Sequence, residues 1–270
     1  MTQAAHDLLV MDDPAFRAFF DAMPCACMIH RMIVDERGDA VDYVPLLANP
    51  WFTRSLAFDP FPIIGKRASE YLPEAEVRHW AAVFAPVALE GRTVSVEVFS
   101  PRKRVNYRVT AIGPERGYFF VMFSVAGEER HSGTQARMAP WTDERLQAHE
   151  AVRLMFHNMP CAAAIHRIDR DGQGKPIDYS VVDVNDAFCG FFDTTSGEII
   201  GMRASARLRV NELAYWLDIF SPVAFGEKRS CGVTLFFRDQ SVVDGIVIAL
   251  ETGFFIVAFV AKEVSKPAGR

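Results

Sequence analysis

Apolar residues near the start of the chain follow one another at the spacing of an α-helix. Phe16, Phe19, Phe20 and Met23 lie three or four positions apart, so they share one helical face. Pro14 is favourable at a first helical position, and the acidic residue before it is a good helix cap. We therefore expect a helix that begins near Pro14 and ends at Met23, directly before a proline.

The pattern then changes to that of β-strands. Residues 26–34 and 41–48 are largely apolar and are separated by polar turn residues, which predicts a hairpin. Three more strands are expected over residues 93–99, 105–112 and 118–125. The last is apolar at nearly every position, so both of its faces should be covered. Helices of the same domain would cover one face, and the preceding helix, a sister domain or a second chain would cover the other.

A long amphipathic segment separates the hairpin from these three strands. Residues 73–89 carry Trp80, Phe84 and Val87 at helical spacing, which predicts a helix with one buried stripe. Asn49 comes directly after the second strand, and asparagine is a strong helix cap. We therefore expect short helices between the second strand and the long helix.

The second half of the chain repeats the first. Residues 15–125 align with residues 151–261 without a gap, and many aligned positions are identical. Each repeat spans about 110 residues, against about 20–50 for the units of solenoid proteins, so each repeat is a whole domain. The shared motifs include Met-Pro-Cys-Ala (23–26 and 159–162), Ile-His-Arg (29–31 and 165–167), Asp-Tyr (42–43 and 178–179) and Arg-Ala-Ser (67–69 and 203–205).

The repeat sets the expected domain organisation. A first domain with its N-terminal helix covers residues 1–126, and a polar linker covers residues 127–141. A second domain with its own leading helix covers residues 142–264, and a tail covers residues 265–270.

The order of these elements, together with several short segments, resembles the PAS domain family. The segments that carry the resemblance are residues 178–188, 196–202, 63–67, 70–74 and 114–119. The resemblance covers most of the chain and implies an α+β fold, in which each domain has a five-stranded antiparallel sheet with helices packed on one face. It also implies a sensory role, through a small ligand or cofactor bound between sheet and helices, or through dimerisation.

Two departures from the family pattern bear on signal output. Many PAS domains end with an Asp-Ile-Thr motif after the last strand, and residues 124–128 and 260–264 lack it. No effector domain follows the second repeat before Arg270. We therefore expect a non-enzymatic protein that signals as a homodimer or through a signalling partner of the kinase or cyclase class, because PAS domains in most relatives are input modules.

The amino-acid composition and the net charge argue against several classes of function. Hydrophobic residues make up 50% of the 270 residues, which is typical of a globular chain. A net charge of −5 and a pI of about 5.8 argue against binding of nucleic acid or of an anionic membrane. Five cysteines without an export signal or a membrane-spanning stretch predict reduced thiols in a cytoplasmic, bacterial protein.

The candidate ligand-binding residues are mostly aromatic. Tryptophan and phenylalanine on the buried stripe of each long helix form either core or the wall of a site for a flat ligand. The histidine on the first strand of each repeat has either a structural role or a ligand contact, and Asp183 either faces solvent at a strand edge or is a polar group in the second site. The full set is His30, Phe52, Trp80, Phe84, His166, Asp183, Phe188, Trp216 and Phe220.

Catalytic and metal chemistry find no support in the sequence. Cys189 follows Asn185 by four residues but lacks the motif of flavin-binding light sensors, and His79 is replaced by tyrosine in the second repeat, which argues against haem. Cys25 and Cys27 are too few ligands for zinc. The expected cofactor is therefore none or a small organic ligand.

The sequence thus favours a stand-alone tandem PAS protein that binds a small ligand or a protein partner in signal transduction. One alternative is a structural dimerisation module without a ligand. The other is a redox sensor that carries haem or flavin. Which repeat senses stays open at this point.

Overall fold

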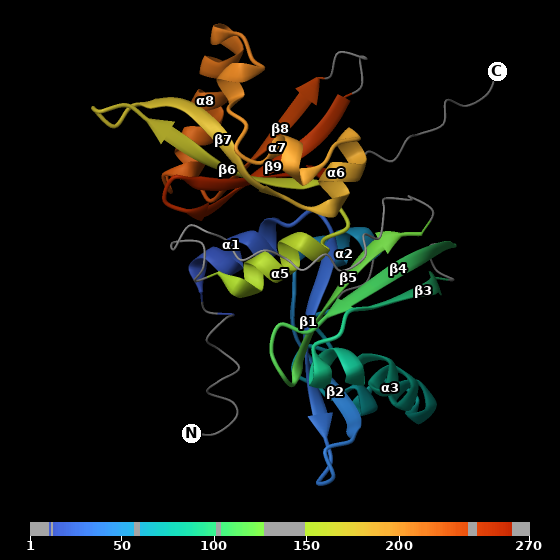
Figure 1. Cartoon of the computed structure of the whole chain (residues 1–270). Helices are drawn as coiled ribbons and strands as arrows, with labels where there is room; N and C mark the ends of the chain where they lie inside the picture. The colour runs from blue at the N-terminus through green and yellow to red at the C-terminus, as the bar shows by residue number, and fades with distance from the viewer. Residues whose placement is uncertain are drawn as a thin grey trace, which may run out of the picture. The chain divides into compact units, whose positions relative to one another are not determined.

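The computed structural model divides the chain into two compact units, Met1–Pro160 and Cys161–Arg270, shown in Figure 1. It describes residues 11, 13–56, 60–100, 104–126, 149–236 and 242–260. The linker expected over residues 127–141 and the tail expected over residues 265–270 lie outside the described residues. Each unit is considered by itself below.

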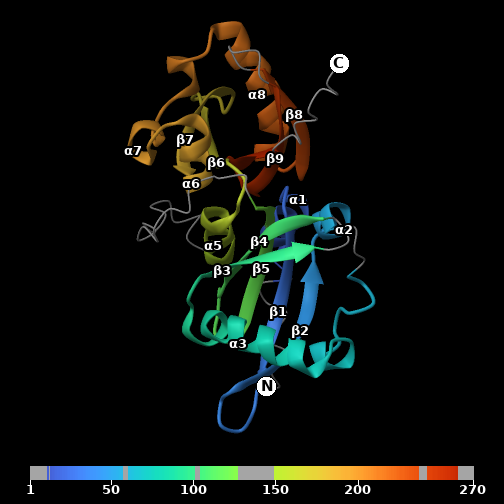
Figure 2. The same ribbon diagram turned by 90° about the vertical axis from the view of Figure 1, so that its right-hand side faces the viewer.

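The first unit is built around one antiparallel sheet with the strand order β2-β1-β5-β4-β3. Figure 2 shows the long helix α3 across one face of this sheet, which we call the inner face. The elements of the unit are α1 (Pro14–Ala22), β1 (Ala26–Val34), β2 (Ala40–Ala48), α2 (Pro50–Leu56), η2 (Ala68–Glu70), α3 (Glu74–Glu90), β3 (Val94–Ser100), β4 (Val105–Ile112), β5 (Tyr118–Val125) and α5 (Glu150–Asn158).

The second unit has the same plan, and its strand order is β7-β6-β10-β9-β8. Its inner face is the one that contacts the long helix α8. The elements are β6 (Ala163–Arg170), β7 (Pro176–Val184), α6 (Asp186–Phe192), α7 (Ser196–Ile199), η3 (Ala204–Ala206), α8 (Val210–Ala224), β8 (Ser230–Phe236), β9 (Val242–Glu251) and β10 (Phe254–Val260). The predicted α+β class with two five-stranded antiparallel sheets is confirmed.

Strand β5 is covered on both faces, as its continuous apolar sequence predicts. Phe119 and Val121 belong to the buried cluster under α3. Phe120 points to the other face, where its ring lies 6.1 Å from that of Phe16 on α1. The preceding amphipathic helix is therefore the cover of the second face in this unit.

No described helix is long and apolar enough to cross a membrane.

Strand β8 departs from the gapless alignment of the repeats. Val94 of β3 is opposite Ala111, whereas Cys231 is opposite Val247, the counterpart of Ala111. The second repeat is therefore shifted by one residue at this strand. Because Cys231, Val233 and Leu235 alternate with polar or small residues, the shift keeps the apolar side chains on the inner face.

A buried asparagine connects the second strand to the first strand and to the helices around it. Asn49 is 2% exposed, and its side-chain oxygen accepts hydrogen bonds from the backbone of Cys27 (3.0 Å) and Phe52 (3.1 Å). Its amide donates to the carbonyls of Cys25 (2.8 Å) and Phe20 (3.2 Å). The predicted helix cap is confirmed, and the same side chain also fixes the start of β1 and the end of α1.

The second unit uses Asn185 in the same way. Its side-chain oxygen accepts from the backbone N–H groups of Ala163 (3.0 Å) and Phe188 (2.9 Å), and its amide donates to the Cys161 carbonyl at 2.9 Å. Asn185 is fully buried. The identity of this residue in both repeats is therefore explained by backbone groups that would otherwise be buried without partners.

We expect Asn49→Ala to lower the free energy of unfolding by roughly 3 kcal/mol, because it leaves several buried backbone groups without partners. Urea denaturation followed by circular dichroism measures the change. The exposed Asn106→Ala on β4 is the control and should shift stability by less than about 0.5 kcal/mol. Equal effects of the two substitutions would contradict the role given to Asn49.

Candidate functional site

An aromatic cluster fills the space between the sheet of the first unit and α3. The His30 ring stacks on Phe119 of the neighbouring strand, with centroids 4.8 Å apart and an interplanar angle of 9°. Tyr43 meets His30 edge-on at 5.7 Å. From the helix side, Phe84 stacks on Phe119 at 5.0 Å, and Trp80 stacks on Phe84 at 5.5 Å. Three sequence-predicted residues, His30, Trp80 and Phe84, are thus brought into one cluster.

The second unit contains the same cluster with nearly the same geometry. His166 stacks on Phe255 with centroids 5.1 Å apart, and Tyr179 meets His166 edge-on at 5.6 Å. Phe220 of α8 lies 4.8 Å from Phe255, and Trp216 stacks on Phe220 at 5.3 Å. Such offset and edge-on contacts are the preferred geometries of aromatic pairs.

Phe52 and Phe188 lie on the inner face and make ring contacts of their own. Phe52 of α2 meets Phe123 edge-on at 5.6 Å. Phe188 of α6 lies 6.0 Å from Phe259, the counterpart of Phe123, and 4.4 Å from Phe192. In the first unit Phe52 belongs to a separate hydrophobic cluster, whereas in the second unit Phe188 packs against the same hydrophobic cluster as Phe220.

Asp183 lies on the opposite face of the sheet from His166. It is opposite Ile165 on β6, whereas Val181 is opposite His166, because a bulge separates the two pairs. β7 is an edge strand, and the Asp183 side chain accepts a hydrogen bond from the backbone of Val184 at 2.8 Å. The structure therefore does not bring Asp183 to the aromatic cluster.

The interior of each cluster is electrically neutral. Burial lowers the pKa of His30 to about 3 and that of His166 to about 4, so both rings are uncharged at neutral pH. Burial also raises the pKa values of Tyr43 and Tyr179. A backbone group of Met28 in the first unit and of Ala164 in the second hydrogen-bonds to the histidine ring and partly opposes the effect of burial on its pKa. The Nδ1 atoms of both histidines are buried and have no hydrogen bond of good geometry among the described residues. Each cluster thus contains one polar atom that could still take a hydrogen bond.

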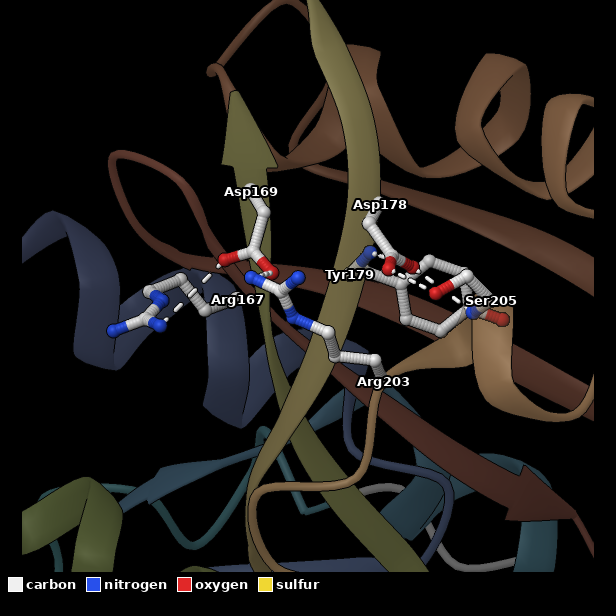
Figure 3. Close-up of polar contacts among 6 residues, drawn as sticks. All are labelled: Arg167, Asp169, Asp178, Tyr179, Arg203 and Ser205. Atoms are coloured by element: carbon white, nitrogen blue, oxygen red, sulfur yellow. Dashed lines mark hydrogen bonds and ion pairs between the residues drawn. The ribbon is translucent and has the colours of Figure 1, made fainter. Parts of the chain in front are cut away.

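A carboxylate on each edge strand is paired with a serine from the segment that precedes the long helix. Asp178 accepts from the Ser205 hydroxyl at 2.6 Å and from its backbone N–H at 3.1 Å, as Figure 3 shows. Asp42 and Ser69 form the same pair, at 2.6 Å and 3.3 Å. In the second unit, Asp169 also lies 3.5 Å from Arg203.

The chain matches no family model and no curated protein. Similar solved structures include the LOV protein of Rhodobacter sphaeroides, at 17% identity and a TM-score of 0.29, over 42% of this chain and 66% of that one. The PAS domain of an HTR-like protein from Haloarcula marismortui is 13% identical, with a TM-score of 0.28, over 46% of this chain and 99% of that one. An RNA-binding light-oxygen-voltage receptor is 8% identical, with a TM-score of 0.28, over 88% and 93%.

Each unit has a five-stranded antiparallel sheet with one long helix on the inner face, which is the architecture that the sequence resemblance implies. In the first unit, α1 covers the other face of the sheet. The strand order and the single long helix are the same in both units. In each unit, the aromatic cluster lies between the sheet and the long helix.

Cys231 packs against the hydrophobic cluster of the second unit, and the His79 ring meets Trp80 edge-on at 4.9 Å at the border of the first cluster. Cys189 is on α6, and burial, followed by the nearby Asp186 and Asp183 carboxylates, raises its pKa. His79 is exposed on α3. Among the described residues, no three histidine, cysteine or acidic side chains group closely enough to hold a metal ion.

Sequence reasoning missed four members of the two clusters. Tyr43 and Phe119, with their counterparts Tyr179 and Phe255, make more of the ring contacts than the predicted tryptophans do. The signal was present, because the Asp-Tyr pair and the closing Gly-x-Phe strand recur in both repeats.

The buried histidines should make the protein sensitive to acid. Their folded-state pKa values lie below the ordinary value near 6.5, so the unfolded chain binds protons first as the pH falls. Stability is therefore full above about pH 6.5 and is lost between there and about pH 4, by about 2 kcal/mol per histidine at pH 5. The double variant His30→Phe, His166→Phe should lose much less stability between pH 7 and pH 5 in urea denaturation.

The exposed His79→Gln is the control for this experiment and should keep the acid sensitivity of the wild type. If the double variant were as acid-sensitive as the wild type, the two histidines would not be the cause.

Proposed function

We propose that this protein is a non-catalytic sensory protein that binds a small molecule between the sheet and the long helix of a PAS-type unit. The observation that carries the proposal is the neutral aromatic cluster around a buried histidine whose Nδ1 has no hydrogen bond of good geometry among the described residues. A buried polar atom without a good hydrogen bond is costly, so a ligand that hydrogen-bonds to it is stabilised by that contact.

The chemistry of the cluster favours an uncharged, flat ligand. Stacked and edge-on rings form surfaces that suit an aromatic molecule. The neutral imidazole offers either a donor or an acceptor at Nδ1, according to its tautomer, and provides no charge to balance an ionised ligand. A small aromatic molecule with one hydrogen-bonding group therefore fits best.

Movement of the tryptophan side chain would make room for such a ligand. Trp80 and Trp216 are half-buried, in contrast to Phe84 (6% exposed) and Phe220 (4% exposed) beneath them. A ring at the border of the cluster can turn outward at a lower cost than one in its centre, because it loses fewer packing contacts. The ligand would then stack on the phenylalanine of the long helix.

Signal output would pass through contact with a second copy of this chain or with a signalling protein of the kinase or cyclase class. The edge strand β3 supports this part of the proposal, because among the described strands only β4 pairs with it. Phe99 on this strand is 58% exposed. An exposed aromatic side chain on an edge strand is typical of a surface that associates with another protein.

A neutral fluorescent probe, N-phenyl-1-naphthylamine, tests the ligand-binding part. We expect the full-length protein to bind it, and we expect Phe220→Leu to weaken the binding by about tenfold, because the ligand loses the ring on which it stacks. Tyr215→Ala, on the exposed side of the same helix (59% exposed), is the matched control and should leave the affinity unchanged. Fluorescence titration measures both affinities.

Native mass spectrometry of gently purified protein complements the titration by detecting a co-purified small molecule. Absence of any bound molecule together with no probe binding would contradict the proposal, and a concentration-dependent dimer under those conditions would favour the dimerisation module instead. A purified protein with visible absorbance would favour the redox-sensor alternative.

A further inference from the structure

One segment in each unit connects the short helices to the long helix along the edge of the sheet. We call it the strap, and it comprises residues 63–71 in the first unit and residues 199–207 in the second. Both straps are fixed to the edge strand by a glycine N–H, from Gly65 to the Pro45 carbonyl and from Gly201 to the Val181 carbonyl, at 2.8 Å in each case. The Asp–Ser pair described above supplies a second attachment in each unit.

The two straps differ in how deeply they are packed. In the first unit, Ala68 is fully buried, and Tyr71 packs against the hydrophobic cluster of the unit. Burial, followed by the Asp42 and Glu70 carboxylates, raises the pKa of Tyr71 to about 12. In the second unit, all residues from 195 to 210 are described and none of them is buried, and the exposed Arg207 replaces the tyrosine.

The residues beneath the second strap are correspondingly more accessible. Tyr43 is 6% exposed and His30 is 8% exposed, whereas their counterparts Tyr179 and His166 are only partly buried. Tyr71 packs against the cluster and lies near Tyr43 in the first unit, and the second unit has the exposed Arg207 at this position.

Polar contacts, rather than apolar packing, hold the second strap closed. The Val181 N–H donates to the Met202 carbonyl at 3.0 Å, and Pro45 has no N–H with which to make this bond in the first unit. Asp169 pairs with Arg203 at 3.5 Å, but the Arg203 side chain is 65% exposed. Figure 3 shows this ion pair beside the Asp178–Ser205 pair.

We propose that the strap of the second unit opens and closes over the aromatic cluster, and that ligand exchange takes place in this unit rather than in the first. Bonds to water replace the hydrogen bonds and the ion pair of this strap when the segment lifts, because Arg203 and Ser205 are exposed and lifting brings water to Asp178. Lifting the first strap would instead expose Ala68 and the ring of Tyr71, which is unfavourable. The ligand part of this inference rests on the proposed function, but the opening of the strap does not.

Residue-resolved amide hydrogen exchange of the full-length protein without ligand tests the opening. Gly65 and Gly201 form a matched pair, because each amide donates to an edge-strand carbonyl at 2.8 Å. After correction for intrinsic rates, we expect Gly201 to be protected roughly tenfold less than Gly65, as local opening dominates exchange in weakly packed segments. Equal or greater protection of Gly201 would overturn the inference.

Substitutions that swap Tyr71 and Arg207 between the two straps test whether these side chains cause the difference in strap opening. Arg207→Tyr should raise the protection of Gly201 several-fold and slow the association of N-phenyl-1-naphthylamine, because the new ring packs as Tyr71 does. The reverse change, Tyr71→Arg, should lower the protection of Gly65. The inference would be overturned if Arg207→Tyr left the exchange protection of Gly201 unchanged, or if Tyr71→Arg left that of Gly65 unchanged. Fast exchange at Gly201 without probe binding to the protein would refute the proposed function and leave the mobile strap standing.

Discussion

The buried asparagine after the second strand is the interaction on which each unit depends. At this point a strand changes direction into a helix inside the protein, and the backbone groups of three elements would otherwise lack partners. The side chain of Asn49 satisfies groups of β1, α1 and α2 at once. It thereby sets where β1 starts, and β1 carries His30 on the inner face opposite Phe119. The position of the aromatic cluster follows from that register.

The cluster in turn limits where charge can lie. Since the buried histidines are neutral, no opposite charge is needed within the cluster, and the buried carboxylates that the structure describes are placed on the edge strands. There Asp42 and Asp178 each find a serine hydroxyl and backbone N–H groups. A carboxylate with several donors is stable when buried. The carboxylates of Asp42 and Asp178 on the edge strands therefore bind the straps, and the aromatic clusters contain no charged group among the described residues.

Much of this fold could be predicted from periodicity and from the repeat. Strands β4 and β5 have the predicted bounds, because apolar runs between clear turn residues leave little choice. The one-residue shift at β8 was not predicted, because the gapless alignment rests on identical residues in other parts of the repeats. In β8 the apolar residues Cys231, Val233 and Leu235 determine the register. The sequence left two positions open for Asp183, because a bulge decides which face of the sheet it occupies and no sequence signal indicates a bulge. The tyrosines were missed because their recurrence was attributed to the fold alone.

Comparison of the two units suggests how duplication can separate stability from access. The stacked rings are of the same residue types and lie at similar distances in the two units. The two units differ in the segment that covers the cluster, where Arg207 and Val181 of the second unit take the positions of Tyr71 and Pro45. Polar contacts in place of the packed Tyr71 ring hold the second strap in the same closed position. The two straps differ in that opening the second one exposes no buried apolar side chain of the strap itself. The two units therefore have the same aromatic cluster, and the strap of the second unit gives a ligand access to it.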